Sequence, residues 1–124
     1  MRKIKTPNTE TTATLAFNSA TELARIIRDK EVSSLELTQY FIDRIERHDN
    51  AINAVVVRDF ERALDAAKTA DAKLAAGQIT GPLHGIPITV KEAYNVEGLA
   101  TTWGVPSHAG KTSQRATPRW SGAW

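Results

Sequence analysis

Residues 81–92 read G-P-L-H-G-I-P-I-T-V-K-E, a turn followed by an apolar stretch with a charged end. Glycine and proline within 81–85 are typical of a turn. Residues 86–91 predict a strand, with Pro87 near its start, where a missing backbone N–H is tolerated. Lys91 would then lie at the end of this strand, where α/β proteins place much of their chemistry.

Three helices are predicted before this stretch. Residues 19–22 and 33–36 each carry a serine followed three residues later by a glutamate, the capping-box pattern that begins a helix. The second helix should run to about His48, and a third should begin after Asp59 and end at Gly77 as its C-terminal cap. The apolar residues predicted to face inward are Leu23, Ile26, Ile27, Leu37, Tyr40, Phe41, Ile45, Phe60, Ala63, Leu64, Ala67 and Leu74.

Residues 54–57 read A-V-V-V, a β-branched run that predicts a strand buried on both faces. The order helix, helix, strand, helix, strand indicates an α/β fold in which helices cover a sheet. Two strands do not make a stable sheet. We therefore expect an incomplete mixed sheet and a chain that forms only part of a larger domain.

Composition excludes several classes of protein. The chain has 124 residues and no cysteine, which excludes a disulfide framework, a thiolate zinc site and a cysteine nucleophile. No apolar run approaches the roughly 20 residues of a membrane span, so no membrane partner is expected. The net charge of +2 arises from a basic tail, residues 111–124, so no nucleic-acid partner is expected for the main body. The start lacks the apolar segment of a secretory signal, and we expect a cytoplasmic location.

Lys91 is the candidate catalytic residue. Its apolar neighbours would partly desolvate the ammonium, which disfavours the charge and lets a lysine act as a base. Taken alone, a solvated lysine at a strand end is the alternative. No metal or cofactor is expected, because His48, His84 and His108 lack metal-ligand spacing and Val105 stands where a phosphate-binding loop would need glycine.

The segment 81–92, together with V-E-G-L-A-T-T-W-G at residues 96–104, resembles the amidase signature family. The upstream order, from residues 33–37 through 53–55, is similar as well, and the resemblance covers about residues 19–110. It implies an α/β/α fold with a large mixed sheet, and hydrolysis of carboxylic amides or transfer of their ammonia through a Ser–Ser–Lys triad. Lys91 occupies the place of the triad lysine, and Glu92 stands where the family more often has aspartate.

The resemblance also implies that most of such a site is absent. The family's Gly-Gly-Ser-Ser-Gly-Gly signature lies downstream, and this chain contains no Gly-Gly pair. We expect a truncated amidase that carries only the lysine, with a small-molecule amide as the parent family's substrate, and inactive by itself. The alternatives are a non-catalytic interaction module, a subunit fragment complementing a separately encoded remainder, or an RNA-binding basic tail. The oligomeric state is not predicted.

Three regions are predicted from this resemblance: a flexible N-terminal arm at 1–18, a partial amidase domain at 19–110, and a non-homologous tail at 111–124. After residue 115 the chain reads A-T-P-R-W, where the family usually has an acidic residue followed by alanine and valine. A coding stretch for Arg-Asp-Ala-Ala-Val-Val, read one base on, can give Ala-Thr-Pro-Arg-Trp-Ser. We therefore interpret the tail as a disordered or frameshifted segment.

Overall fold

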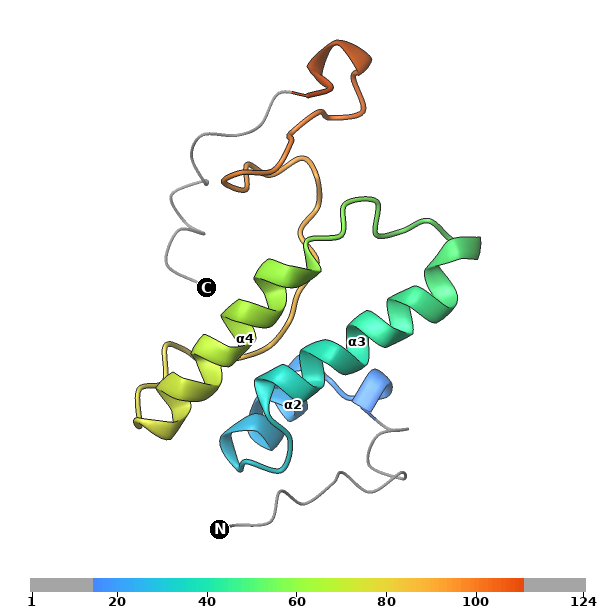
Figure 1. Ribbon diagram of the computed structural model, residues 1–124. Coiled ribbons are helices and arrows are strands. Elements are labelled where there is room, and N and C mark those ends of the chain that lie inside the picture. Colours follow the sequence, from blue (N-terminus) through green and yellow to red (C-terminus); the bar gives the residue numbers. More distant parts are fainter. Residues whose placement is uncertain (1–14, 111–124) are drawn as a thin grey trace. The chain divides into compact units, whose positions relative to one another are not determined.

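The computed structural model describes residues 15–110 of the chain (Figure 1). It divides into two units, residues 1–87 and 88–124, of which 15–87 and 88–110 are described. The described helices of the first unit are η1 (Leu15–Phe17), α2 (Ala20–Arg28), α3 (Ser34–His48), η2 (Asp49–Ala51) and α4 (Phe60–Ala75), where η denotes a 3-10 helix. The described part of the second unit consists of loops and η3 (Pro106–His108). Within residues 15–110, no helix has the length and apolar character needed to cross a membrane.

Serine side chains begin α2 and α3, as the capping boxes predict. At α3, the Ser33 hydroxyl accepts from the Glu36 N–H at 3.1 Å, and the Glu36 carboxylate accepts from the Ser33 N–H at 2.8 Å. At α2, Ser19 accepts from the Glu22 N–H at 3.2 Å, while the Glu22 carboxylate pairs with Arg25 at 2.9 Å. The capping box is therefore complete at α3 and half-formed at α2. A serine cap of this kind contributes about 1 kcal/mol.

Helix α4 ends at a glycine, as predicted. The Gly77 N–H donates to the Leu74 carbonyl at 3.0 Å, and the Gln78 N–H donates to the Lys73 carbonyl at 2.8 Å. These two bonds form a Schellman motif, which needs a left-handed residue after the helix, and Gly77 has φ of +74°. At the other end Asp59 is the N-cap residue, but its side chain makes no capping hydrogen bond.

The core of the first unit is apolar and includes a residue that the sequence places in the N-terminal arm. Leu15 is only 3% exposed, so the arm predicted over 1–18 does not extend to residue 18; residues 1–14 lie outside the described part. The ordered chain therefore begins before the first capping box. The core residues are Leu15, Leu23, Ile26, Ile27, Val32 and Leu37, with Tyr40, Phe41, Leu74 and Ile86 packed against them.

Helices α3 and α4 pack side by side and run antiparallel (Figure 1). Asp71, near the end of α4, accepts from the N–H groups of Ser34 and Leu35 at 2.7 and 3.0 Å. These N–H groups belong to the first turn of α3 and have no partner within their own helix. A negative charge is also favourable at a helix N-terminus. The start of α3 is therefore capped twice, once by its own Ser33 and once by α4.

Neither predicted strand forms within the described residues. Val56 and Val57 are 65% and 51% exposed, although the sequence predicts burial on both faces for residues 54–57. Residues 86–91 are likewise not a strand. A strand needs a neighbour to satisfy its backbone hydrogen bonds, and a β-branched run carries no information about whether that neighbour is present. The α/β part of the prediction is therefore not confirmed for residues 15–110.

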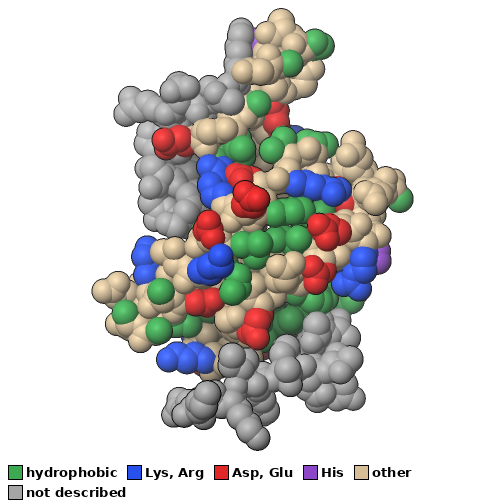
Figure 2. Space-filling view, in the orientation of Figure 1, with side chains coloured by type: hydrophobic (Ala, Val, Ile, Leu, Met, Phe, Trp, Pro, Cys, Tyr) green, Lys and Arg blue, Asp and Glu red, His purple; other side chains and the backbone are tan. Residues whose placement is uncertain are grey.

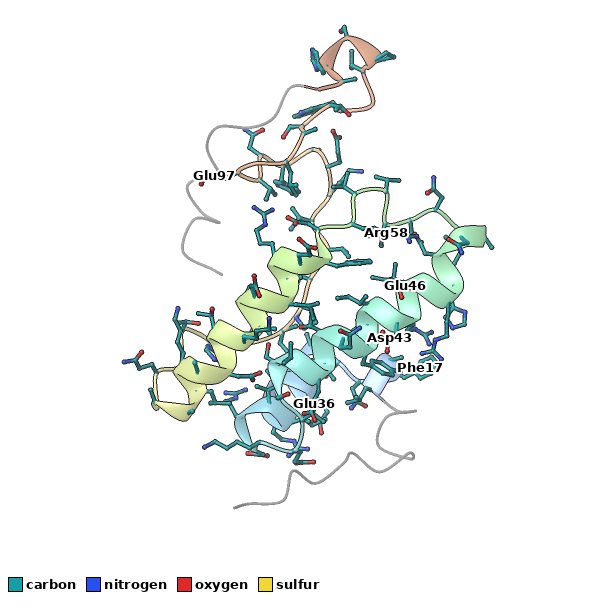
Figure 3. All side chains as sticks on the ribbon, viewed as in Figure 1. Phe17, Glu36, Asp43, Glu46, Arg58 and Glu97 are labelled. Carbon is teal, nitrogen blue, oxygen red and sulfur yellow. The ribbon has the colours of Figure 1, made fainter. Side chains whose placement is uncertain are left out.

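A side chain holds the 54–57 segment in place of a partner strand. The buried carboxylate of Asp49 accepts from the Ala54 N–H at 2.8 Å and from the Val55 N–H at 3.2 Å, and it pairs with Arg58 at 3.4 Å. Figure 3 labels Arg58 in the segment that joins α3 to α4. The hydrogen bond from Ala54, with help from Val55 and Arg58, lowers the pKa of Asp49 below its ordinary value. The carboxylate therefore stays charged at neutral pH.

Several large apolar side chains of the first unit reach the surface. Figure 2 shows hydrophobic side chains in a band bordered by acidic and basic ones. Exposed apolar residues that lie together are typical of a surface that another element covers. The large apolar residues of the first unit that are exposed are Phe17, Ile52, Val56, Val57, Ile79 and Leu83.

Candidate active site

The turn at 80–87 is fixed to the helices by a buried histidine. His84 Nε2 lies 2.9 Å from the Ala70 carbonyl oxygen of α4, and Nδ1 lies 3.2 Å from the Thr80 backbone nitrogen. A carbonyl only accepts and a backbone N–H only donates, so Nε2 carries the proton and Nδ1 accepts. The Thr80 hydroxyl also contacts Nδ1, at 2.9 Å. With both nitrogens occupied, His84 acts as a structural bridge.

Gly85 lies against the start of α3, where a larger residue would not fit. Its carbonyl accepts from the Ser34 hydroxyl at 2.6 Å, and Ser34 is buried. Gly85 has φ of +78°, a conformation that residues with a Cβ rarely adopt. An added Cβ would lie 3.1 Å from Ser34 Cβ and 3.2 Å from Ser34 Oγ. The second glycine of the G-P-L-H-G-I-P string is therefore required by both backbone conformation and space.

Lys91, the predicted catalytic residue, belongs to the second unit and is exposed. Its carbonyl accepts from the Tyr94 N–H at 3.0 Å, which closes a turn over 91–94. The sequence places Lys91 at a strand end with its ammonium partly desolvated, and in this structure it has neither surrounding. The reason is the one that applies to the strands, since the elements that would cover it are not among the described residues. Its catalytic role stays a prediction.

Glu92 binds backbone amides that lie ten and eleven residues further along the chain. Its carboxylate accepts from the Thr102 N–H, and Oε2 accepts from the Trp103 N–H at 2.9 Å. Hydrogen bonds from Thr102, through its hydroxyl and N–H, and from the Trp103 N–H lower the pKa of Glu92. In the sequence, Glu92 stands out only as a departure from aspartate, and this contact is missed. An acid followed by a turn-forming T-T-W-G segment is too general a signal to reveal it.

Residues 15–110 contain no group of three or more histidine, aspartate or glutamate side chains able to hold a metal ion. His84 has both nitrogens bound within the fold, and Glu92 and Asp49 are held by backbone N–H groups. The described residues thus bring one lysine and one anchored carboxylate together in sequence, and no nucleophile set. The chemistry that this segment can offer is proton acceptance by Lys91.

Comparison with known proteins identifies the family. Residues 36–117 match the family described as Amidase, which covers most of the chain and includes Lys91. The chain therefore belongs to the amidase family, as the 81–92 and 96–104 segments predict. The match runs seven residues into the predicted tail and stops before Pro118.

The similar curated proteins share one name, which describes a subunit of glutamyl-tRNA(Gln) amidotransferase. The protein of that name from Aromatoleum aromaticum is 46% identical over 86 residues, which are 69% of this chain and 17% of the relative. The one from Acidothermus cellulolyticus is 43% identical over 90 residues, 73% of this chain and 18% of the relative. The one from Moorella thermoacetica is 41% identical over 88 residues, 71% of this chain and 18% of the relative. The chain thus spans about a sixth of the length of these relatives.

Proposed function

We propose that this chain supplies the lysine of an amidase-type Ser–Ser–Lys site, with Lys91 as the proton acceptor. The observation that carries the proposal is the family match over residues 36–117, which includes Lys91 in its L-H-G-I-P…V-K context. The reaction class is cleavage of a carboxylic amide C–N bond. Because the similar proteins are named amidotransferases, transfer of the released ammonia to glutamyl-tRNA(Gln) is the specific form that we favour.

In this reaction, neutral Lys91 accepts a proton, relayed through a bridging serine, from the hydroxyl of a nucleophilic serine. The serine oxygen attacks the amide carbonyl, the C–N bond breaks, and the nitrogen leaves as ammonia after taking up the proton. Water then releases the acyl group as a carboxylic acid. The chain contains no Gly-Gly pair, so we place both serines on sequence outside these 124 residues.

An exposed lysine is normally charged and cannot accept a proton at neutral pH. Lys91 is exposed in the described structure, so its activity as a base requires that other parts of an amidase domain cover it. We propose that the same covering part provides neighbours for residues 54–57 and 86–91. These segments would then become strands of the α/β/α sheet expected for the family.

A chimera tests the proposal. In the Aromatoleum aromaticum relative, the aligned 86 residues are replaced by those of this chain, and amidation of glutamyl-tRNA(Gln) and ammonia release are measured. Lys91→Ala and Lys91→Arg should each lower turnover by roughly a thousandfold or more, because losing one member of such a triad removes most of its catalysis. Lys73→Ala is the matched control and should leave turnover unchanged. An active Lys91→Ala chimera would refute the proposed role.

A second candidate function is a module that complements a separately made polypeptide. The exposed apolar residues Ile52, Val56 and Val57, at 70%, 65% and 51%, favour it, because a self-sufficient domain rarely exposes such a run. Co-expression with the remainder of a curated relative should then give a stable, catalytically active complex. A monomer that unfolds cooperatively and ignores the remainder would favour an autonomous domain instead.

We also propose that the residues after 115 derive from a shifted reading frame. The support is that A-T-P-R-W replaces the acidic and aliphatic residues usual in the family, and that the family match ends at residue 117. The coding DNA tests this directly. If no reading frame past codon 115 continues with an amidase-like sequence, the proposal fails.

A further inference from the structure

The carboxylate of Glu92 closes the loop that follows Lys91. Both of its oxygens accept from the Trp103 N–H, at 3.1 and 2.9 Å, and Oε1 also accepts from the Thr102 N–H. Bonds from N–H groups to an ionised carboxylate are among the stronger hydrogen bonds in proteins. Trp103 has φ of +56°, which is unfavourable for a bulky side chain. The carboxylate therefore stabilises a loop conformation that the backbone would not readily adopt by itself.

Two further hydrogen bonds connect this closure to Lys91. The Thr101 hydroxyl donates to the Tyr94 carbonyl at 3.4 Å, two residues beyond Glu92. The Tyr94 N–H in turn donates to the Lys91 carbonyl at 3.0 Å. The Lys91 backbone is thus bound on one side to a turn whose other end is fastened to the 101–103 segment. All of these residues belong to the second unit, so the arrangement stands without reference to the first.

We propose that Glu92 is a positioning residue, which clamps the N–H groups of Thr102 and Trp103 and thereby fixes the backbone that presents Lys91. The proposal rests on the proposed role of Lys91 as proton acceptor. Glu92 itself is not an acid or base for the reaction, because its oxygens are taken up by backbone N–H groups. The positive charge of Lys91 adds to the preference for a charged Glu92 carboxylate.

The lowered pKa of Glu92 agrees with this arrangement. The sign follows from linkage: the clamp is complete above the ordinary glutamate pKa and is lost as the pH falls through the lowered value. The same two amides that lower the pKa should therefore report its protonation. This gives a test that needs no turnover, so its failure would leave the proposed amide chemistry standing, and failure of that chemistry would leave the clamp standing.

Amide NMR of the full 124-residue chain between about pH 7 and pH 2.5 provides the test, a range that spans the ordinary glutamate pKa. The Thr102 and Trp103 amide resonances should shift together with a midpoint below the ordinary value for glutamate. Glu92→Gln should abolish the shift and speed hydrogen exchange at the Tyr94 amide by about tenfold. Glu46→Gln, which removes an exposed charge from α3 of the first unit, is the matched control and should change neither.

Two results would overturn the proposal. One is a Thr102 and Trp103 pair that does not titrate, or that titrates equally in Glu92→Gln. The other is a Tyr94 amide and Lys91 carbon shifts that are the same with and without the Glu92 carboxylate, since the clamp would then not reach Lys91. If Glu92→Gln does not fold, the pH series on the unchanged chain decides the question, because protonation removes the charge without a substitution.

Discussion

Replacement of Gly85 by alanine should destabilise the first unit more than any other single methyl group added at a described glycine of that unit. A residue with a Cβ at φ of +78° costs roughly 1–2 kcal/mol. The new Cβ would meet Ser34 Cβ at 3.1 Å and Oγ at 3.2 Å, and relieving such overpacking costs about 1–3 kcal/mol more. The smaller entropy of the unfolded alanine chain offsets roughly 0.5 kcal/mol. We expect the free energy of unfolding to fall by about 3 kcal/mol.

Two other glycines separate the contributions. Gly77 has φ of +74° and no atom within 4 Å of an added Cβ, so Gly77→Ala measures backbone strain alone, about 1 kcal/mol. Gly81 also has open space and no positive φ, so Gly81→Ala should be nearly neutral. Adding Ser34→Gly to Gly85→Ala removes both contacted atoms and should recover part of the loss through a coupling energy.

Urea unfolding followed by far-UV circular dichroism measures these differences. For a unit of this size, about 3 kcal/mol corresponds to a melting temperature lower by on the order of 10–20 °C. If Gly85→Ala and Gly77→Ala cost the same, the packing of Gly85 against Ser34 contributes nothing and the reasoning fails. If both are neutral, the argument from backbone conformation fails too.

Three further predictions concern polar contacts of the first unit. His84→Ala should lower the unfolding free energy by about 2 kcal/mol, because it leaves the Thr80 N–H without its acceptor; urea unfolding measures this, and a neutral result would contradict the bridge. Asp71→Ala should cost about 1–2 kcal/mol and increase hydrogen exchange at the first-turn amides of α3, whereas Asp65→Ala, on the exposed side of α4, should not; equal effects would exclude the second cap. Asp49 has a lowered pKa, so its stabilisation is present above the ordinary aspartate value and is lost as the pH falls through the folded value; Asp49→Asn should therefore be less stable than the unchanged chain at about pH 7 and converge with it near about pH 3, and a constant difference across this range would be inconsistent with that assignment.

The helices could be predicted because their signals are local. A serine and a glutamate three residues apart begin α3 with both capping bonds, and Gly77 ends α4 in the predicted left-handed conformation. Each signal depends on a few neighbouring residues, so it survives whatever the rest of the chain does. The inward faces of α2 and α3 follow from the same local periodicity, and Ile27 and Leu37 are buried as expected.

The strands and the long-range contacts could not be predicted in the same way. Residues 54–57 have the composition of a strand, but pairing depends on a second segment, and in the described structure Asp49 binds the N–H groups of Ala54 and Val55 instead. The Glu92 contact to residues 102–103 likewise depends on how a loop closes, which side-chain type alone does not specify. Lys91 is singled out chiefly through family resemblance, since an exposed lysine has no structural signal of its own.

The carboxylate of Asp71 on the first turn of α3 has a consequence for synthesis on the ribosome. Helix α3 emerges first, with its own serine as its sole cap, and the second acceptor arrives only when nearly all of α4 has been translated. Until then two amides at its beginning remain hydrated, and the nascent helix frays from that end. The hairpin of α3 and α4 should therefore be completed in one late step, after residue 71 has left the exit tunnel, and pausing before that codon should lengthen the exposure of the nascent chain to chaperones.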